Sequence, residues 1–202
     1  MEGKVLLQSN CSMYRLSSKE ELDTFSCGDK DLDDFFHQDA LFYDKQLLGK
    51  TYFISTVKEN VDKIVCAFTL ANDSIKAALI PNTSRNKIQR KIPNSKRTRS
   101  YPAVLIGRLG VASEFQGRDY NIGSQVIDYI ASWFIHPDNK TGCRFIVVDA
   151  YNKPNVLHFY EKNGFKFLYS DDSLEKEANH IPEDETLTAR MMYLDLISYS
   201  ID

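Results

Sequence analysis

The 202-residue sequence lacks any apolar run of about 18 residues, the length that a membrane-spanning helix needs. Its N-terminus has an apolar patch of only three residues and no small-residue cleavage site, so we expect neither a signal peptide nor membrane association. Cysteine is scarce, and its positions show no CxxC spacing: Cys11, Cys27, Cys66 and Cys143. This pattern predicts free thiols in a reducing, cytoplasmic environment.

Histidine is equally scarce, and its dispersed positions predict no metal site: His37, His136, His158 and His180. The hydrophobic share of 43% and the aromatic share of 12% are those of a globular protein rather than a disordered one. A chain of this length buries a substantial core in one domain and is short for two. We therefore expect residues 1–202 to form a single domain.

Hydrophobic periodicity predicts alternating strands and helices along the chain. Strands are expected over residues 11–16, 51–57, 63–74, 105–111, 144–150, 165–169 and 187–197. Helices are expected from about Ser124 to Phe134, over 155–163, and after Asp29, where one face carries Leu32, Phe35, Phe36, Ala40, Tyr43 and Leu47. The strand–helix–strand order in the middle implies a parallel pair with a right-handed crossover. The predicted fold is α/β, a mixed, twisted sheet of about seven strands with helices on both faces.

A polar turn lies between the strand ending near Val111 and the helix beginning near Ser124. The first N–H groups of a helix lack intrahelical partners and carry the positive end of its dipole, so such a turn can bind an anion. Gly123 would let the backbone approach a phosphate closely. The alternative is an ordinary strand-to-helix turn.

A second motif begins where the strand 144–150 ends. Pro154 suits the first turn of a short helix and Gly164 suits the position after its last turn. The helix between them carries Phe159 and Tyr160.

In order and spacing, the two motifs resemble those of the GCN5-related N-acetyltransferases. That family binds the pyrophosphate of acetyl-CoA on a loop of pattern Arg/Gln-x-x-Gly-x-Gly/Ala. Arg118, Asn121 and Gly123 occupy its fixed places, with Asn121 where the first glycine is usual; asparagine is the residue other than glycine that best tolerates positive φ. The family's closing motif is matched by Phe159, Tyr160, Gly164 and Phe165.

The resemblance implies an enzyme that uses acetyl-CoA as co-substrate and needs no metal. It assigns cofactor binding to the strand end Leu109, Gly110 and Val111, to the loop residues Gln116, Gly117, Arg118, Asp119, Tyr120, Asn121, Ile122, Gly123 and Ser124, and to Asn152. The strand backbone would pair with the pantetheine amides and polarise the thioester carbonyl. The Gln116 side chain either binds the cofactor or only shapes the loop. Asn152 either bonds the cofactor or caps the following helix.

Tyr160 is the candidate general acid for the departing thiolate, with an aromatic packing role as the alternative. No general base is evident, because the cofactor strand carries Arg108 and glycines but no carboxylate. Asp149 and Asp73 are expected to be capping or surface residues, and water could deprotonate an amine of lowered pKa. Since no cysteine falls in the two motifs, we expect direct attack by the amine rather than a covalent enzyme intermediate.

A narrower resemblance is carried by Phe25–Phe36, Ala67–Ala71 and Leu105–Val111, which look like toxin-type acetyltransferases that modify aminoacyl-tRNA. Three functions follow as expectations. The first is acetyl transfer to a small-molecule or protein primary amine. The second is a toxin acting on the amino group of charged tRNA, and the third is a non-catalytic CoA-binding protein. A homodimer is possible in each case.

Residues 84–100 contain no carboxylate, although the net charge of the chain is −3. The segment holds seven cations: Arg85, Lys87, Arg90, Lys91, Lys96, Arg97 and Arg99. Such a segment can bind RNA, another acidic substrate or the 3′-phosphate of CoA, and it can also be a solvated loop. It contains no aromatic residue for base stacking.

Overall fold

The computed structural model of the chain describes residues 7, 10–58, 60–79, 82, 85–86, 92, 100–117 and 120–199. Its contacts group into two compact units, Met1–Ala71 with Ile106–Trp133 and Asn72–Leu105 with Phe134–Asp202. The strands Val61–Lys76 (β3) and Ser100–Val111 (β4) each supply residues to both units. The expectation of a single domain stays a prediction.

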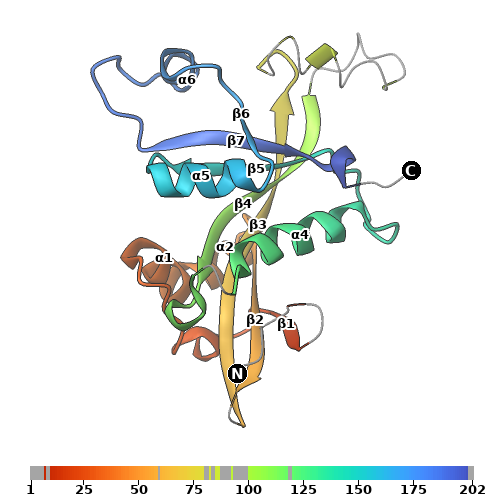
Figure 1. Cartoon of the computed structure of the whole chain (residues 1–202), viewed down its shortest axis with the longest axis vertical. Helices are drawn as coiled ribbons and strands as arrows, with labels where there is room; N and C mark the ends of the chain where they lie inside the picture. The colour runs from red at the N-terminus through yellow and green to blue at the C-terminus, as the bar shows by residue number, and fades with distance from the viewer. Residues whose placement is uncertain are drawn as a thin grey trace. The chain divides into compact units, whose positions relative to one another are not determined.

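Seven strands form one mixed sheet in the order β1-β2-β3-β4-β5-β7-β6 (Figure 1). The remaining strands are β1 (Cys11–Arg15), β2 (Lys50–Lys58), β5 (Phe145–Tyr151), β6 (Lys166–Phe167) and β7 (Ala189–Asp195). β1, β2 and β3 pair antiparallel, β4 and β5 pair parallel, and β7 runs antiparallel to both β5 and β6. The predicted α/β fold with a mixed seven-stranded sheet is confirmed.

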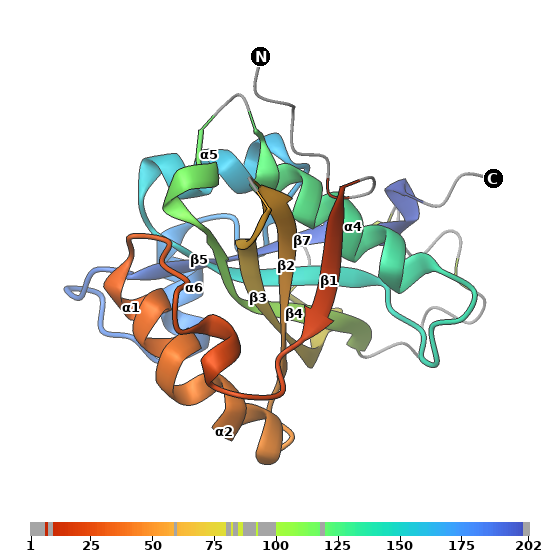
Figure 2. The ribbon, with the colours of Figure 1, turned by 90° about the horizontal axis from the view of Figure 1, so that it is seen from below.

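In the first unit, helical segments lie before β2 and after β4. They are η1 (Glu20–Leu22), α1 (Lys30–Asp34), the π-helical turn η2 (Phe35–Asp39), α2 (Ala40–Lys45), the 3-10 turn η4 (Ser113–Phe115) and α4 (Ile122–Ile135). Asp29 starts α1 because its carboxylate accepts the N–H groups of Asp31 and Leu32. Figure 2 shows α1 and α2 to one side of the first three strands and α4 to the other.

The side chains of β2 and β3 show which face α4 covers. Tyr52 pairs with Phe68 across the two strands, and its ring meets Trp133 of α4 edge-on at 5.0 Å between centroids. The neighbouring pair, Thr51 and Thr69, share a hydrogen bond of 2.7 Å between their hydroxyls. Because successive side chains of a strand alternate between faces, these threonines point away from α4.

The helix after Asp29 ends earlier than its apolar pattern predicts. Leu47 was assigned to its buried face, but it lies beyond α2 at φ 58° and is 88% exposed. The N–H groups of Leu47 and Leu48 donate to the carbonyls of Asp44 and Tyr43, which is how a helix closes through a left-handed residue. The predicted buried position is wrong because no glycine marks the stop in the sequence.

The second unit packs an aromatic core between β4, β5 and β7. Phe145 is fully buried, and its ring meets those of Tyr101 and Tyr193 edge-on at 5.7 and 5.5 Å between centroids. The helices of this unit are α5 (Pro154–Lys162), α6 (Asp172–Asn179) and the short η5 (Leu196–Ser198). The predicted helix over 155–163 is confirmed as α5.

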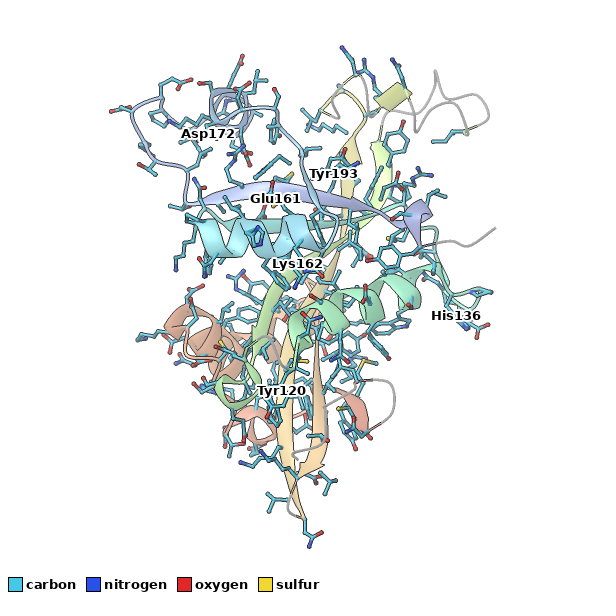
Figure 3. The ribbon with its side chains drawn as sticks, viewed as in Figure 1. Tyr120, His136, Glu161, Lys162, Asp172 and Tyr193 are labelled. Atoms are coloured by element: carbon cyan, nitrogen blue, oxygen red, sulfur yellow. The ribbon has the colours of Figure 1, made fainter. Side chains whose placement is uncertain are left out.

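Helix α6 lies in the acidic stretch 171–185, for which the sequence predicted no structure. Asp171 caps it through the N–H of Leu174, and Figure 3 shows Asp172 on its first turn. Glu175 is 2% exposed and accepts hydrogen bonds of 2.6 Å from Arg190 Nε and from the Met191 N–H. A buried ion pair between α6 and β7 therefore orders this stretch.

Candidate active site

Two described residues of the loop between β4 and α4 have left-handed backbone conformations. Gly117 has φ 115° and Asn121 has φ 51°. The left-handed conformation expected of Asn121, in place of a glycine, is confirmed. Arg118 and Asp119, two predicted cofactor residues, lie outside the described residues.

Gln125, in the first turn of α4, holds this loop in place. Its Nε2 donates to the carbonyl of Tyr120 at 2.9 Å, and its Oε1 accepts the Leu7 N–H at 3.0 Å. The Asn121 N–H donates to the Gly117 carbonyl at 3.3 Å, which closes the loop on itself. Figure 3 shows Tyr120 on this loop, just before the helix begins. The described end of the loop, at Tyr120 and Asn121, is thus held by the first turn of the helix and by Gly117.

The start of α4 contains a buried polar atom that lacks a partner. Ser124 is 8% exposed, and its Oγ has no hydrogen-bond partner among the described residues. The neighbouring Ile122 is buried, which presses this first turn against the core. An unpaired hydroxyl at a helix N-terminus fits an anionic ligand such as a phosphate, because the dipole and the free N–H groups act on the same side.

A turn from the N-terminal region packs against the end of β4. A Cβ atom built on Gly110 would lie 3.2 Å from Cys27 Sγ and from Phe25 Cζ, so a larger residue there would require these side chains to shift. The Ser113 N–H donates to the Ser26 carbonyl at 3.0 Å. The three residues assigned to the thioester, Leu109–Val111, therefore have one side closed by protein.

Asp33 and Gln116 hold this turn in place. The Asp33 carboxylate accepts the Cys27 N–H and the Ser26 hydroxyl, each at 2.8 Å; burial alone would raise its pKa, but these hydrogen bonds lower it overall. Gln116 Nε2 donates to the carbonyls of Cys27 at 2.7 Å and Val111 at 2.8 Å. These contacts agree with the interpretation in which Gln116 shapes the loop.

The parallel pairing of β4 with β5 joins residues 103–105 to residues 145–147. Both strands continue beyond the paired segment toward their C-terminal ends. Leu109, Gly110 and Val111 lie in that continuation of β4, beyond the three residues of the strand that pair with β5.

In the second unit, Tyr160 lies on α5, mostly buried between two aromatic rings. Phe159 and Phe165 each meet its ring edge-on at 5.1 Å between centroids. Burial raises the pKa of Tyr160 to about 12. The phenol is therefore protonated at every physiological pH, so it can donate a proton but cannot act as a phenolate base.

Asn152 does not cap α5. The residue at the cap position is Lys153, which makes no capping hydrogen bond, and Asn152 Nδ2 instead donates to the Leu187 carbonyl at 2.9 Å. Its N–H donates to the Thr188 carbonyl. The capping interpretation of Asn152 is wrong, because its amide ties the end of β5 to the segment before β7. Its contact with the cofactor stays a prediction.

The structure places the two candidate carboxylate bases, Asp149 and Asp73, at exposed positions. Among the described residues, no group of three or more histidine, cysteine, aspartate or glutamate side chains is arranged to hold a metal ion. In the same residues, no helix has the length and apolar character that crossing a bilayer requires.

Comparison with solved structures identifies proteins that share this fold. No family model and no curated protein sequence matches the chain. A tyrosine-to-phenylalanine mutant of KacT superposes with a TM-score of 0.67 at 15% identity, covering 94% of this chain and 97% of its own. AtaT complexed with acetyl-methionyl-tRNAfMet gives 0.63 at 18% identity, with 94% and 97% covered, and AtaTR bound with AcCoA gives 0.62 at 20%, with 94% and 95% covered.

This chain has the fold of the GCN5-related N-acetyltransferases. The fold predicted from the two motifs is thus confirmed along nearly the whole chain. Sequence reasoning had not assigned a role to Arg108, Phe35, Asp33 or Gln125, which the structure places around β4 and the loop. For Arg108 the alternation of side chains along β4 could have indicated this position, because Arg108 shares a face of the strand with Gly110.

Proposed function

We propose that the protein is an acetyl-CoA-dependent N-acetyltransferase that moves an acetyl group to a primary amine by direct attack. The observation that carries this proposal is the β4–loop–α4 arrangement, with Gly117 and Asn121 at positive φ. In it the buried Ser124 hydroxyl has no hydrogen-bond partner within the described part of the chain. The shared fold of a neighbour bound with AcCoA supports it.

In this proposal the pyrophosphate binds to the N–H groups of residues 117–124, with the Arg118 guanidinium adding charge-assisted hydrogen bonds. The pantetheine amides pair with the backbone of Leu109–Val111, whose N–H groups also polarise the thioester carbonyl. Holding the amine and the thioester in one geometry supplies on the order of 7 kcal/mol or more in favourable systems.

Tyr160 acts as the general acid toward the departing thiolate. Complete proton transfer from a phenol of pKa about 12 to a solvated thiolate of pKa about 8.5 would cost roughly 5 kcal/mol. A thiolate released into buried surroundings is more basic, since burial raises the pKa of the Cys143 thiol in this protein to about 11. Against such a thiolate, the cost falls to about 1 to 2 kcal/mol, which is compatible with an acid role.

The Cys27 thiol, which packs beside the strand end assigned to the thioester, is unsuited to covalent catalysis. Cys27 packs against Gly110, and burial, together with the charges of Asp33 and Asp29, raises its pKa to about 11. Only the thiolate is an effective nucleophile, so Cys27 stays inert near neutral pH. This favours direct attack by the amine.

Replacing Gly123 with aspartate is expected to weaken acetyl-CoA binding more than tenfold, over about 1.4 kcal/mol. The new side chain adds bulk and negative charge where the phosphates approach the helix N-terminus. Calorimetric titration of the folded variant with acetyl-CoA measures the effect.

Gly142→Asp is the matched control, because a Cβ at Gly142 meets no atom within 4 Å and the residue lies in the other unit. Equal affinity in the Gly123 variant and the wild type would contradict the proposed phosphate site. Absence of acetyl transfer to every amine in a screen by mass spectrometry, despite tight binding, would select a non-catalytic CoA-binding protein.

A second candidate function is acetylation of the amino group of charged tRNA. One structural neighbour, AtaT, was solved with acetyl-methionyl-tRNAfMet. The carboxylate-free segment 84–100 gives this chain a cationic region that suits a polyanion. Apart from Arg85, Asn86, Ile92 and Ser100, residues 84–100 lie outside the described residues.

Neutralising Lys96, Arg97 and Arg99 together is expected to weaken binding of charged tRNA and to reduce its salt dependence, because fewer counterions are released. Acetylation of a small amine should change little. Filter binding across a salt series, with parallel small-amine kinetics, separates the outcomes. No change with either acceptor would indicate a solvated loop, and loss with both would indicate that the segment holds the 3′-phosphate of CoA.

A further inference from the structure

Arg108 is a half-buried cation of β4 with no counter-charge among the described residues. Its Nη1 donates to the Gly107 carbonyl at 2.8 Å, while its buried Nε has no hydrogen-bond partner in the described part of the chain. No described carboxylate forms an ion pair with it. Buried charges are normally paired, and an unsatisfied buried donor costs about 1–3 kcal/mol. The unpaired Nε–H and the uncompensated charge both point to an oxygen supplied by a ligand.

The guanidinium of Arg108 is held over an aromatic ring. Its Cζ lies 5.0 Å from the centroid of the Phe35 ring, which Tyr43 supports edge-on at 5.1 Å. Phe35 begins the π-helical turn η2, and His37 of the same turn bonds the Phe25 carbonyl at 2.8 Å. Turns of this kind are rare and occur frequently at functional sites. The stacking therefore fixes the cation before any ligand binds.

Arg108 shares a face of β4 with Gly110, because the two residues are separated by one position. The neighbours of that face are Phe35, Phe25 and Cys27. Helix α4, whose N-terminus is the proposed phosphate site, covers the opposite side of the strands (Figure 2). On this face Cys27 and Phe25 cover Gly110, whereas Arg108 is only half-buried. An acceptor that approaches this part of β4 from the face not taken by α4 would therefore meet Arg108.

We propose that Arg108 determines acceptor specificity by binding the carbonyl oxygen next to the attacking amine, so that α-aminoacyl groups are preferred to simple alkyl amines. The inference rests on the acetyltransferase function proposed above. A guanidinium beside the amine also lowers the amine pKa, since two like charges disfavour one another. An α-amino group, with an ordinary pKa of about 7.7–8.0, then becomes neutral near pH 7 without a carboxylate base. A lysine-type amine, of pKa about 10.4, stays charged and is repelled.

The test compares alanine amide with sec-butylamine, a carbonyl-free amine of similar size, each measured at a pH where the free amine is neutral. In Arg108→Gln, the KM for alanine amide is expected to rise at least tenfold, while kcat/KM for sec-butylamine stays within about twofold. The acid limb of kcat with alanine amide, which reports the bound amine, should move to higher pH. Acetyl-CoA affinity measured by calorimetry should not change.

Arg108→Lys separates the effect of the positive charge from that of the guanidinium geometry. It also keeps a long aliphatic side chain, so it can be tested if the glutamine variant folds poorly. In this variant the acid limb of kcat should stay at the low pH of the wild type. The KM for alanine amide should nevertheless rise, because an ammonium lacks the planar fork of donors. Arg15→Gln is the matched control, since Arg15 is an exposed cation of the same unit paired with Asp44.

Equal effects on the two amines, or none on either, would overturn the role of Arg108. If the wild type binds acetyl-CoA and acetylates sec-butylamine as well as alanine amide, the specificity inference fails and the acetyltransferase function stands. If the wild type binds no acetyl-CoA, the proposed function itself fails.

Discussion

Replacing Tyr160 with phenylalanine is expected to lower kcat about a hundredfold, the scale of general acid catalysis, with little change in acetyl-CoA affinity. Only a hydroxyl is removed, and the ring contacts with Phe159 and Phe165 at 5.1 Å remain. Single-turnover kinetics at saturating amine isolates the chemical step. Tyr14→Phe, on the exposed face of β1, is the matched control.

The pH dependence of kcat gives a second measurement of the same role. Burial raises the pKa of Tyr160 to about 12, so the phenol keeps its proton well above pH 10, where an exposed tyrosine loses half of it. Loss of activity through Tyr160 ionisation should therefore begin only as the pH approaches 12, and this limb should be absent in Tyr160→Phe. A kcat within about twofold of the wild type, where chemistry is rate-limiting, would make Tyr160 a packing residue.

Replacing Glu175 with alanine should destabilise the second unit by about 3–5 kcal/mol, the usual effect of removing one partner of a buried ion pair. Arg190 is 9% exposed and would keep only Asp172, a more exposed partner on the rim of the cluster. The Met191 N–H would also lose its acceptor. Urea unfolding followed by fluorescence and circular dichroism measures the change in free energy of unfolding.

Glu177→Ala serves as the control, because Glu177 is an exposed residue of the same helix and such substitutions usually change stability by less than about 0.5 kcal/mol. Glu175→Gln should be milder than Glu175→Ala, since an amide oxygen can still accept from the Met191 N–H. Similar unfolding midpoints for the alanine variants at 175 and 177 would show that the ion pair contributes little.

The elements whose residues alternate or repeat cleanly were predictable from the chain alone. The β4–loop–α4 segment carries its own signals: an apolar strand, an asparagine able to take positive φ, and a helix with a buried apolar face. Strand β5 and helix α5 are equally explicit, because Pro154 opens the helix and Gly164, at φ 86°, follows it. These local signals positioned the proposed cofactor loop and Tyr160.

Helix α6 and the end of α2 were not predictable in the same way. The stretch containing α6 has few apolar residues, and its order depends on Glu175 meeting Arg190, which is fifteen positions away. Leu47 fits the apolar period of the preceding helix. The chain nevertheless turns there through backbone hydrogen bonds, and no residue at that position predicts the turn. For α6 the decisive interaction lies outside the window in which periodicity is read, and at Leu47 it is a backbone turn that side-chain periodicity does not report.

The sequence by itself determined the fold class and the strand–turn–helix order around the loop, because both depend on patterns in contiguous residues. The residues that the resemblance assigns to acetyl-CoA stay a prediction. Tertiary structure alone decided what surrounds them. It packed Cys27 against Gly110, held that turn through Asp33 and Gln116, and set Arg108 over Phe35. These contacts join residues far apart in the chain, and their free energies depend on burial, which the composition of a short segment does not specify.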